Sequence, residues 1–202
     1  MARLLLATTN RGKLREIRSV LAGTALDLVT LADYPDIPPP AETGRTFEEN
    51  ARLKARYYAE RTGELTVAED SGLEIDALGG APGVESARFG GEHTSYPEKF
   101  RLIYDALRAR GAATSTARFV CAVALADGGP AGARGAVLFE TRGTVEGRIA
   151  QAPRGEGGFG YDPIFFYPPF NRTLAEASAQ KSTVSHRGKA FRGLRAYLEA
   201  HF

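Results

Sequence analysis

The centre of the chain reads Leu65-Thr66-Val67-Ala68-Glu69-Asp70-Ser71-Gly72-Leu73-Glu74-Ile75. Its apolar ends are typical of two buried strands, and the glycine at position 72 predicts a turn between them. The acidic pair Glu69-Asp70 therefore stands where a strand meets a turn. Adjacent carboxylates at such a place either belong to an ordinary solvated turn or hold a hard cation such as Mg²⁺, which prefers oxygen ligands.

Hydrophobic periodicity outward from this stretch predicts strands and helices that alternate along the chain. Strands are expected at 3–8, 26–31, 65–68, 73–75, 116–126, 136–145 and 164–166. Helices are expected at 11–21, 47–61, 95–110, 173–179 and 186–200. The strands at 116–126 and 136–145 are expected to form a hairpin through Gly128-Gly129-Pro130. This order predicts an α/β fold with a mixed β-sheet flanked by helices.

The composition limits the classes of protein to which the chain can belong. Its 202 residues, 43% of them hydrophobic, suffice for a single domain, 1–202, with a sizeable core. Lys and Arg number 26 against 24 Asp and Glu, and this balance argues against a nucleic-acid polymer as partner. The single cysteine, Cys121, permits no intramolecular disulfide, which suits a reducing compartment. No apolar run has the length of a signal-peptide core or a membrane span, so we expect a cytoplasmic protein with no membrane partner.

The segment Thr8-Thr9-Asn10-Arg11-Gly12-Lys13 follows the first predicted strand and opens the first predicted helix, with Asn10 as a typical N-cap residue. Backbone N–H groups at a helix N-terminus bind anions, and a lysine beside them adds a point charge for phosphate. The segment lacks the longer glycine-rich loop of a Walker A motif. It is either a phosphate-binding loop or an ordinary helix start with a surface lysine.

A further carboxylate, Glu42, lies in the proline-rich loop before a capping box formed by Thr46 and Glu49. Acidic residues in the first turn of a helix complement its dipole, which explains Glu49 without another role. That explanation does not extend to Glu42, which is available as a second carboxylate ligand for a cation near Asp70. Lys54, in the same predicted helix, is expected to be a solvated surface lysine.

The glycine-rich segment Gly155–Pro163 allows the backbone to approach a flat ligand closely. Within it, Phe159 and Tyr161 are candidates for stacking on a base, and Asp162 can accept a hydrogen bond from a ring N–H. The alternative is a glycine-rich turn whose aromatic side chains belong to the core.

Three residues near the C-terminus, Lys181, His186 and Arg187, bring cationic or hydrogen-bonding groups close together in sequence. A basic helix start opposes the helix dipole, so a structural role alone explains this pattern poorly. Arg187 carries hydrogen-bond donors only. It can therefore donate to a carbonyl oxygen on a base.

In their order along the chain, these segments resemble the inosine/xanthosine triphosphate pyrophosphatase (Ham1-like) family. The resemblance covers essentially the whole chain and is carried by 8–13, 46–51, 70–73, 79–84, 157–163 and 185–188. The chain departs from the family pattern at Thr9, where members often have Gly, and at Glu69, where many have Asp. Because of that second departure, we assign Glu69 no essential role.

The resemblance implies hydrolysis of ITP, dITP and XTP to the monophosphate and pyrophosphate, a reaction that removes deaminated purines from the nucleotide pool. It implies Mg²⁺ as cofactor, with Mn²⁺ as an alternative, and a small-molecule nucleotide as substrate. It also implies a homodimer and an elongated mixed α/β fold of two lobes, with the active site in the cleft between them.

The resemblance also implies roles for individual residues. Asp70 is expected to be the catalytic base and a metal ligand, with Glu42 as the other ligand. The substrate-binding residues that it implies are Thr8, Thr9, Asn10, Arg11, Gly12, Lys13, Ser71, Phe159, Gly160, Tyr161, Asp162, Lys181, His186 and Arg187.

Two other functions compete with this interpretation. One is a Maf-like nucleotide pyrophosphatase that acts on modified pyrimidines, against which the segments 159–162 and 185–187 argue. The other is a nucleotide-binding regulator without catalysis, which would not need both acidic groups and the phosphate-loop lysine.

Overall fold

Leu65–Ile75 forms one continuous strand, β3, and not the two strands separated by a turn that the sequence predicts. The structure is a computed structural model that describes residues 2–129 and 134–202. A Cβ built on Gly72 would lie 2.4 Å from Ser86 Oγ and 2.6 Å from Gly83 O. Glycine is needed there because another segment packs closely against the strand, as glycines inside strands often indicate. The predicted turn at Gly72 is therefore wrong.

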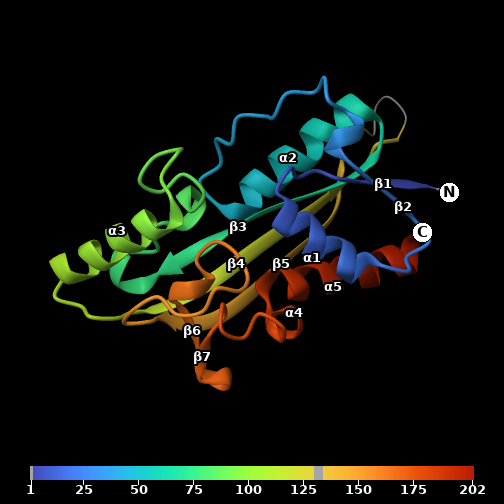
Figure 1. Cartoon of the computed structure of the whole chain (residues 1–202). Helices are drawn as coiled ribbons and strands as arrows, with labels where there is room; N and C mark the ends of the chain where they lie inside the picture. The colour runs from blue at the N-terminus through green and yellow to red at the C-terminus, as the bar shows by residue number, and fades with distance from the viewer. Residues whose placement is uncertain (1, 130–133) are drawn as a thin grey trace. The chain divides into compact units, whose positions relative to one another are not determined.

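The sheet is mixed, as the sequence predicts, with strand order β2-β1-β3-β4-β5-β6-β7 (Figure 1). Strand β1 pairs in parallel with β2 and with β3, whereas β6 pairs antiparallel with β5 and with β7. The remaining strands are β1 (Arg3–Leu6), β2 (Asp27–Thr30), β4 (Thr116–Ala126), β5 (Val137–Ile149), β6 (Phe165–Tyr167) and β7 (Arg172–Thr173). In the hairpin predicted between β4 and β5, Pro130 lies outside the described residues.

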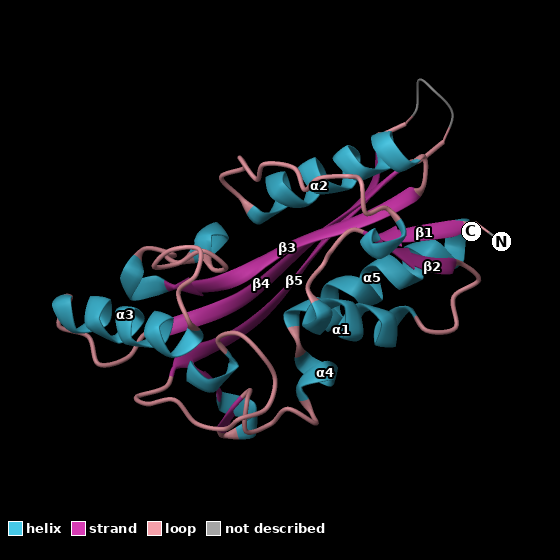
Figure 2. Cartoon of the chain, turned by 45° about the horizontal axis from the view of Figure 1, so that its top comes forward, coloured by secondary structure: helices cyan, strands magenta, loops and turns pink. Residues whose placement is uncertain are grey.

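The helices are α1 (Arg11–Leu21), α2 (Phe47–Thr62), α3 (Tyr96–Ala109), α4 (Lys181–Val184) and α5 (His186–His201) (Figure 2). The starts of α1 and α2 follow local capping signals. The predicted capping box of α2 is confirmed, since Thr46 Oγ1 accepts from Glu49 N and the Glu49 carboxylate accepts from Thr46 N. The helix predicted at 173–179 is wrong, because residues 174–180 form turns after β7.

The chain divides into two compact units. Unit 1 comprises Met1–Asp70, Cys121–Gly143 and His186–Phe202, and unit 2 comprises Ser71–Val120 and Thr144–Ser185. In unit 1, α1 and α5 pack against each other on one face of the strands, and α2 covers the opposite face (Figures 1 and 2). The core between the strands and α1 with α5 contains Leu4, Leu6, Ile17, Leu21, Val67, Val123, Phe191 and Leu194.

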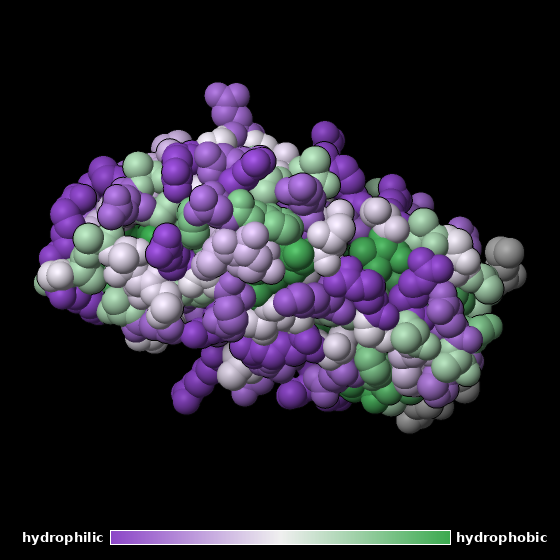
Figure 3. Space-filling view, turned by 90° about the horizontal axis from the view of Figure 1, so that it is seen from below, coloured by the Kyte–Doolittle hydropathy of each residue, from purple (hydrophilic) through white to green (hydrophobic). Residues whose placement is uncertain are grey.

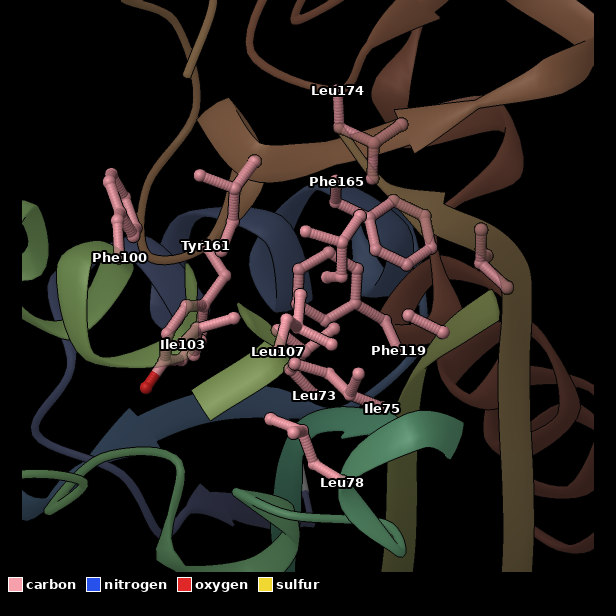
Figure 4. Packing of buried hydrophobic residues seen from close by; sticks show 14 residues of the cluster. Leu73, Ile75, Leu78, Phe100, Ile103, Leu107, Phe119, Tyr161, Phe165 and Leu174 are labelled. Carbon is pink, nitrogen blue, oxygen red and sulfur yellow. The ribbon is translucent and has the colours of Figure 1, made fainter. Parts of the chain in front are cut away.

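Unit 2 has a separate core built around aromatic side chains (Figure 4). The Phe119 and Phe165 rings face each other at 4.5 Å between centroids. Leu73 and Ile75 of β3 and Ile103 of α3 are all fully buried in the same cluster. Each unit therefore has a hydrophobic core of its own.

Apolar and polar side chains are mixed on the surface. Figure 3 shows one face, on which hydrophilic residues (purple) and apolar residues (green) are interspersed. Tyr96, Leu138 and Phe202 are large apolar side chains with 38–52% of their surface exposed, and scattered residues of this kind are normal. Within residues 2–129 and 134–202, no helix combines the length and the hydrophobicity that a membrane crossing needs.

A pair of glycines tests how closely α5 approaches β5 in unit 1. A Cβ on Gly143 of β5 would lie 2.0 Å from the His186 carbonyl oxygen, whereas the atom nearest to a Cβ on Gly193 of α5 would be Thr141 Oγ1, at 3.1 Å. We expect Gly143→Ala to lower the free energy of unfolding by about 1–3 kcal/mol through overpacking. Gly193→Ala should be nearly neutral, because the better helix propensity of alanine offsets the tight contact. Urea unfolding of both variants followed by circular dichroism measures this, and equal losses would contradict it.

Candidate active site

The segment 8–13 joins β1 to α1 and is held by its own side chains. Asn10 is the N-cap, as predicted, and its Oδ1 accepts from Gly12 N at 2.9 Å and from Lys13 N at 3.1 Å. These are two of the backbone donors that the sequence predicts for phosphate. In this structure both donate to Asn10 Oδ1, so the helix cap already uses these two donors.

A cavity of about 610 Å³ in unit 1 opens beside this segment. Its volume lies within the range of pockets that bind small molecules. The polar and charged side chains that line it include Thr8, Thr9, Arg11, Lys13, Glu42, Lys54 and Glu69. The cavity thus combines three cationic side chains with two carboxylates, a composition suited to a phosphate-bearing ligand that is bound together with a cation.

Asp70 and Glu42 come together at Lys54, as two acidic ligands of one cation would. Lys54 Nζ lies 3.1 Å from Glu42 Oε1 and 3.4 Å from Asp70 Oδ1. The side chain of Asp70 also accepts from Asn50 Nδ2 at 3.0 Å. Lys54 has only 12% of its side chain exposed, so its prediction as a solvated lysine is wrong. Asn50 and Lys54 are four residues apart in α2 and share one face of the helix, a spacing that could have identified both.

Burial affects the titration of Asp70 and Lys54 in different ways. Burial raises the pKa of Asp70 above its ordinary value, although Lys54 and the hydrogen bond from Asn50 act against this. Burial alone would lower the pKa of Lys54, but the carboxylates of Asp70 and Glu42 outweigh it and raise that pKa. Lys54 therefore stays charged, and Asp70 binds protons more readily than an exposed aspartate.

The residues around Lys54 fit a magnesium site. Within residues 2–129 and 134–202, no group of three or more His, Cys, Asp or Glu side chains is placed to hold a metal ion. Mg²⁺ usually needs only one or two carboxylates, with water and substrate phosphates as its other ligands. Glu42 and Asp70 already face the same positive charge, that of Lys54 Nζ. Their assignment as metal ligands stays a prediction that this geometry supports.

Glu69 is buried on the face of β3 opposite to Asp70, because neighbouring side chains of a strand alternate. Its side chain is 1% exposed, and Glu69 Oε1 lies 2.7 Å from Lys13 Nζ and 3.5 Å from Arg187 Nε. Cys121 Sγ lies 3.4 Å from Glu69 Oε2. Burial alone would raise the pKa of Glu69, but Lys13 and Arg187 hold that pKa well below its usual range.

Arg187 and His186 begin α5 and are both buried in unit 1. Besides its contact with Glu69, Arg187 donates from Nη1 to Glu16 Oε2 at 2.6 Å. The Arg187 side chain is only 2% exposed. Sequence reasoning missed Glu16, and its place on the half-buried side of α1 is the only local signal of this role. Contact of His186 and Arg187 with a purine base stays a prediction.

In unit 2, the glycine-rich segment and Lys181 come together as predicted. Asp162 Oδ2 accepts from Phe159 N at 2.9 Å and from Lys181 Nζ at 2.7 Å. Lys181 Nζ lies 4.3 Å from the centroid of the Phe159 ring, at cation–π distance. Gly158 and Gly160 have φ near +70°, a conformation that favours glycine. The loop is thus folded around the buried carboxylate of Asp162.

Tyr161 belongs to the core of unit 2, and its prediction as a stacking residue is corrected here. Its ring packs edge-on against Tyr96, and its hydroxyl donates to the Ser86 carbonyl oxygen at 2.8 Å. Figure 4 shows Tyr161 among the buried apolar side chains of this core. Only 4% of the residue is exposed. Phe159 is half-buried and remains the stacking candidate of the segment. Ser71 directly follows Asp70 in β3 and is half-buried, so its predicted substrate contact stays untested.

The Asp162–Lys181 pair allows a test of this loop. Both side chains are at most 5% exposed, so Lys181→Met would leave a buried carboxylate without its cation. We expect a loss of about 3–5 kcal/mol in the free energy of unfolding. The control is Arg88→Met, whose partner Glu85 is exposed, and its loss should stay below about 1 kcal/mol. Similar urea unfolding curves for the two variants would show that the buried pair does not organise the loop.

Comparison with known proteins identifies the family of the chain. The model of the Ham1 family matches residues 4–197. A dITP/XTP pyrophosphatase of an Exiguobacterium species is 48% identical over 97% of this chain and 96% of its own length. A dITP/XTP pyrophosphatase of Gloeobacter violaceus is 51% identical over 95% of this chain and 91% of its own. The structure of a HAM1 protein from Coxiella burnetii superposes with a TM-score of 0.89 at 38% identity, covering 99% of this chain and all of that one. The chain belongs to the Ham1 family.

Proposed function

We propose that this protein hydrolyses the purine nucleoside triphosphates dITP, XTP and ITP to the monophosphate and pyrophosphate, with Mg²⁺ or alternatively Mn²⁺. Family membership supports the proposal, as do the relatives named dITP/XTP pyrophosphatase at 44–51% identity. By removing deaminated purine nucleotides, such an enzyme keeps them from being incorporated by polymerases.

The observation that carries the proposal is that Glu42 and Asp70 both contact Lys54, beside the segment 8–13 that is proposed to bind phosphate. Both carboxylates lie within 3.4 Å of Lys54 Nζ. Glu42, Lys54 and Lys13 line one cavity. A triphosphate bound with a divalent cation needs this combination of acidic and basic groups.

Hydrolysis to pyrophosphate requires water to attack the α-phosphorus, so that the β- and γ-phosphates leave together. The cationic groups of Lys13 and Arg11 and the hydroxyls of Thr8 and Thr9 bind the phosphate oxygens. A bound Mg²⁺, held by Glu42 and Asp70, would supply neutralisation of phosphate charge and a lowered pKa for coordinated water.

Asp70 takes the proton of the attacking water onto its carboxylate. Its raised pKa suits a general base better than that of an exposed aspartate would, because the proton transfer is less unfavourable. The hydrogen bond from Asn50 Nδ2 to Asp70 Oδ2 fixes the carboxylate. Lys54 keeps a positive charge at the same point while the proton is transferred.

For recognition of the base, we propose that Arg187 donates to the 6-keto oxygen. A guanidinium has five N–H donors, and contact with Glu16 and Glu69 does not require all of them. Phe159, held by Asp162 and beside Lys181, would stack on the purine.

We further propose that the enzyme is a cytoplasmic homodimer. Light scattering of the purified protein is the direct test of its assembly.

The first test of the function is product analysis with dITP and Mg²⁺. We expect pyrophosphate and dIMP, and Asp70→Asn should fold normally but lose about 10²- to 10⁴-fold in turnover, the usual contribution of a general base. Asp105→Asn, which alters an exposed aspartate of α3 paired with arginines, is the matched control and should keep full activity. Orthophosphate as first product, or no turnover of dITP alongside turnover of UTP, would refute the proposal. Binding without any turnover would favour the regulator.

Arg187→Ala tests base discrimination. Loss of the guanidinium should lower the ratio of kcat/KM for dITP over dATP by at least tenfold, because buried donors that lose their partner reject an analogue strongly. The variant also removes the arginine that contacts Glu69 and Glu16, which lowers the fraction of folded enzyme. The ratio of the two kcat/KM values does not depend on that fraction. Arg52→Ala, on exposed ion-pair surface, should leave the ratio unchanged. An unaltered ratio in Arg187→Ala would assign discrimination to another group.

A further inference from the structure

Of the two carboxylates that line the cavity, Glu42 and Glu69, only Glu42 has a role in the proposed metal site. Glu69 is neither a proposed metal ligand nor the proposed general base. It directly precedes Asp70 in the chain, yet its cationic partners come from α1 and α5, whereas Asp70 contacts Asn50 and Lys54 of α2. A carboxylate 1% exposed cannot be solvated by bulk water, so it depends on the cations around it. Those cations are Lys13 and Arg187.

Lys13 is the less buried partner, with 20% of its side chain exposed, and it lines the cavity next to Thr8 and Arg11. An ammonium has three donors on a flexible four-carbon stem. The contact of 2.7 Å between Lys13 Nζ and Glu69 Oε1 fixes the position of the ammonium group beside the cavity. The remaining donors can then meet an anion without the entropy loss that ordering a mobile lysine requires.

Arg187 holds Glu69 from the other side and is itself held by Glu16 of α1. The four side chains form a sequence of alternating charge: Lys13, Glu69, Arg187 and Glu16. Glu69 Oε1 lies 2.7 Å from Lys13 Nζ and 3.5 Å from Arg187 Nε, so the carboxylate is placed between two cations. Its surroundings are cationic, which argues against a role as a third ligand for a cation.

We infer that Glu69 is a positioning residue, which holds the ammonium of Lys13 toward the cavity so that it can bind the phosphates of the substrate. The inference rests on the proposed function only in naming the substrate as a nucleoside triphosphate. Its physical content, that Glu69 acts on anion binding through Lys13, applies to any polyphosphate.

The experiment is a double-mutant cycle on binding of inorganic tripolyphosphate, measured by calorimetry with and without Mg²⁺. The variants are Glu69→Gln, Lys13→Met and the double variant, and Glu140→Gln, in an exposed pair with Arg52, is the control. We expect Glu69→Gln alone to raise the dissociation constant about 10- to 100-fold, as loss of a charged hydrogen bond does. In the Lys13→Met background the same change should alter it less than about twofold.

Two results would overturn the inference. Equal weakening in both backgrounds would mean that Glu69 only supports the fold. Tighter binding by Glu69→Gln would mean that Glu69 competes with the anion for Lys13. If Glu69→Gln does not fold, the cycle is run with Glu69→Asp, which keeps the charge but shortens the arm by one methylene. That variant should show a smaller effect of the same sign that again disappears in the Lys13→Met background.

The outcome also separates this inference from the proposed function. Tripolyphosphate binding that depends on Glu69 only when Lys13 is present supports the inference even if dITP yields no pyrophosphate. In that case only the catalytic proposal fails. Normal hydrolysis of dITP together with additive effects in the cycle would leave the function intact and refute the role of Glu69.

Discussion

The buried carboxylate of Glu69 imposes the strongest constraint on unit 1. An ionised group without access to water must be surrounded by cations or donors, and the chain supplies them from two helices that are far apart in sequence. Lys13 comes from the first turn of α1, and Arg187 from the first turn of α5. The ion cluster therefore links the start of the C-terminal helix to the loop that is predicted to bind phosphate. The close contact of α1 with α5 and the Glu16–Arg187 pair reinforce the same link.

The pleat of β3 turns one acidic pair into two different groups. Glu69 faces α1 and α5, where full charges lower its pKa despite its burial. Asp70 faces α2, where burial is the larger effect and raises its pKa. Adjacent carboxylates thus differ in proton affinity because their environments differ, as acid–base pairs in enzymes often do. The group with the raised pKa is suited to exchange protons, and the group with the lowered pKa is suited to remain a fixed charge.

Local signals in the sequence predicted the starts of α1 and α2 correctly, because caps depend on neighbouring residues. Asn10 and the Thr46–Glu49 capping box mark helix starts that the structure confirms. The errors arise where a distant segment decides. The sequence predicts a turn at Gly72, but glycine is needed there because Ser86 packs against the strand and leaves no room for a side chain. Likewise, Lys54 reads as a surface residue, because nothing near it in sequence indicates that Glu42 and Asp70 surround it. The sequence pointed to Glu42 and Asp70 but not to Lys54, which contacts both of them.

Both units contain a buried ion pair that stability alone does not explain. Glu69 in unit 1 and Asp162 in unit 2 are each at most 3% exposed and each contacts a lysine at 2.7 Å. Burying two charges costs desolvation that their attraction often fails to recover, and apolar replacements are frequently as stable. A chain selected only for stability would have little reason to keep such a pair in either unit. Lys13 lines the cavity proposed for phosphate, and Lys181 lies over the ring proposed to stack on the base. The two buried pairs thus both contain a lysine that is proposed to lie beside the bound nucleotide. This is expected if each pair holds a ligand-binding group in position before the substrate binds.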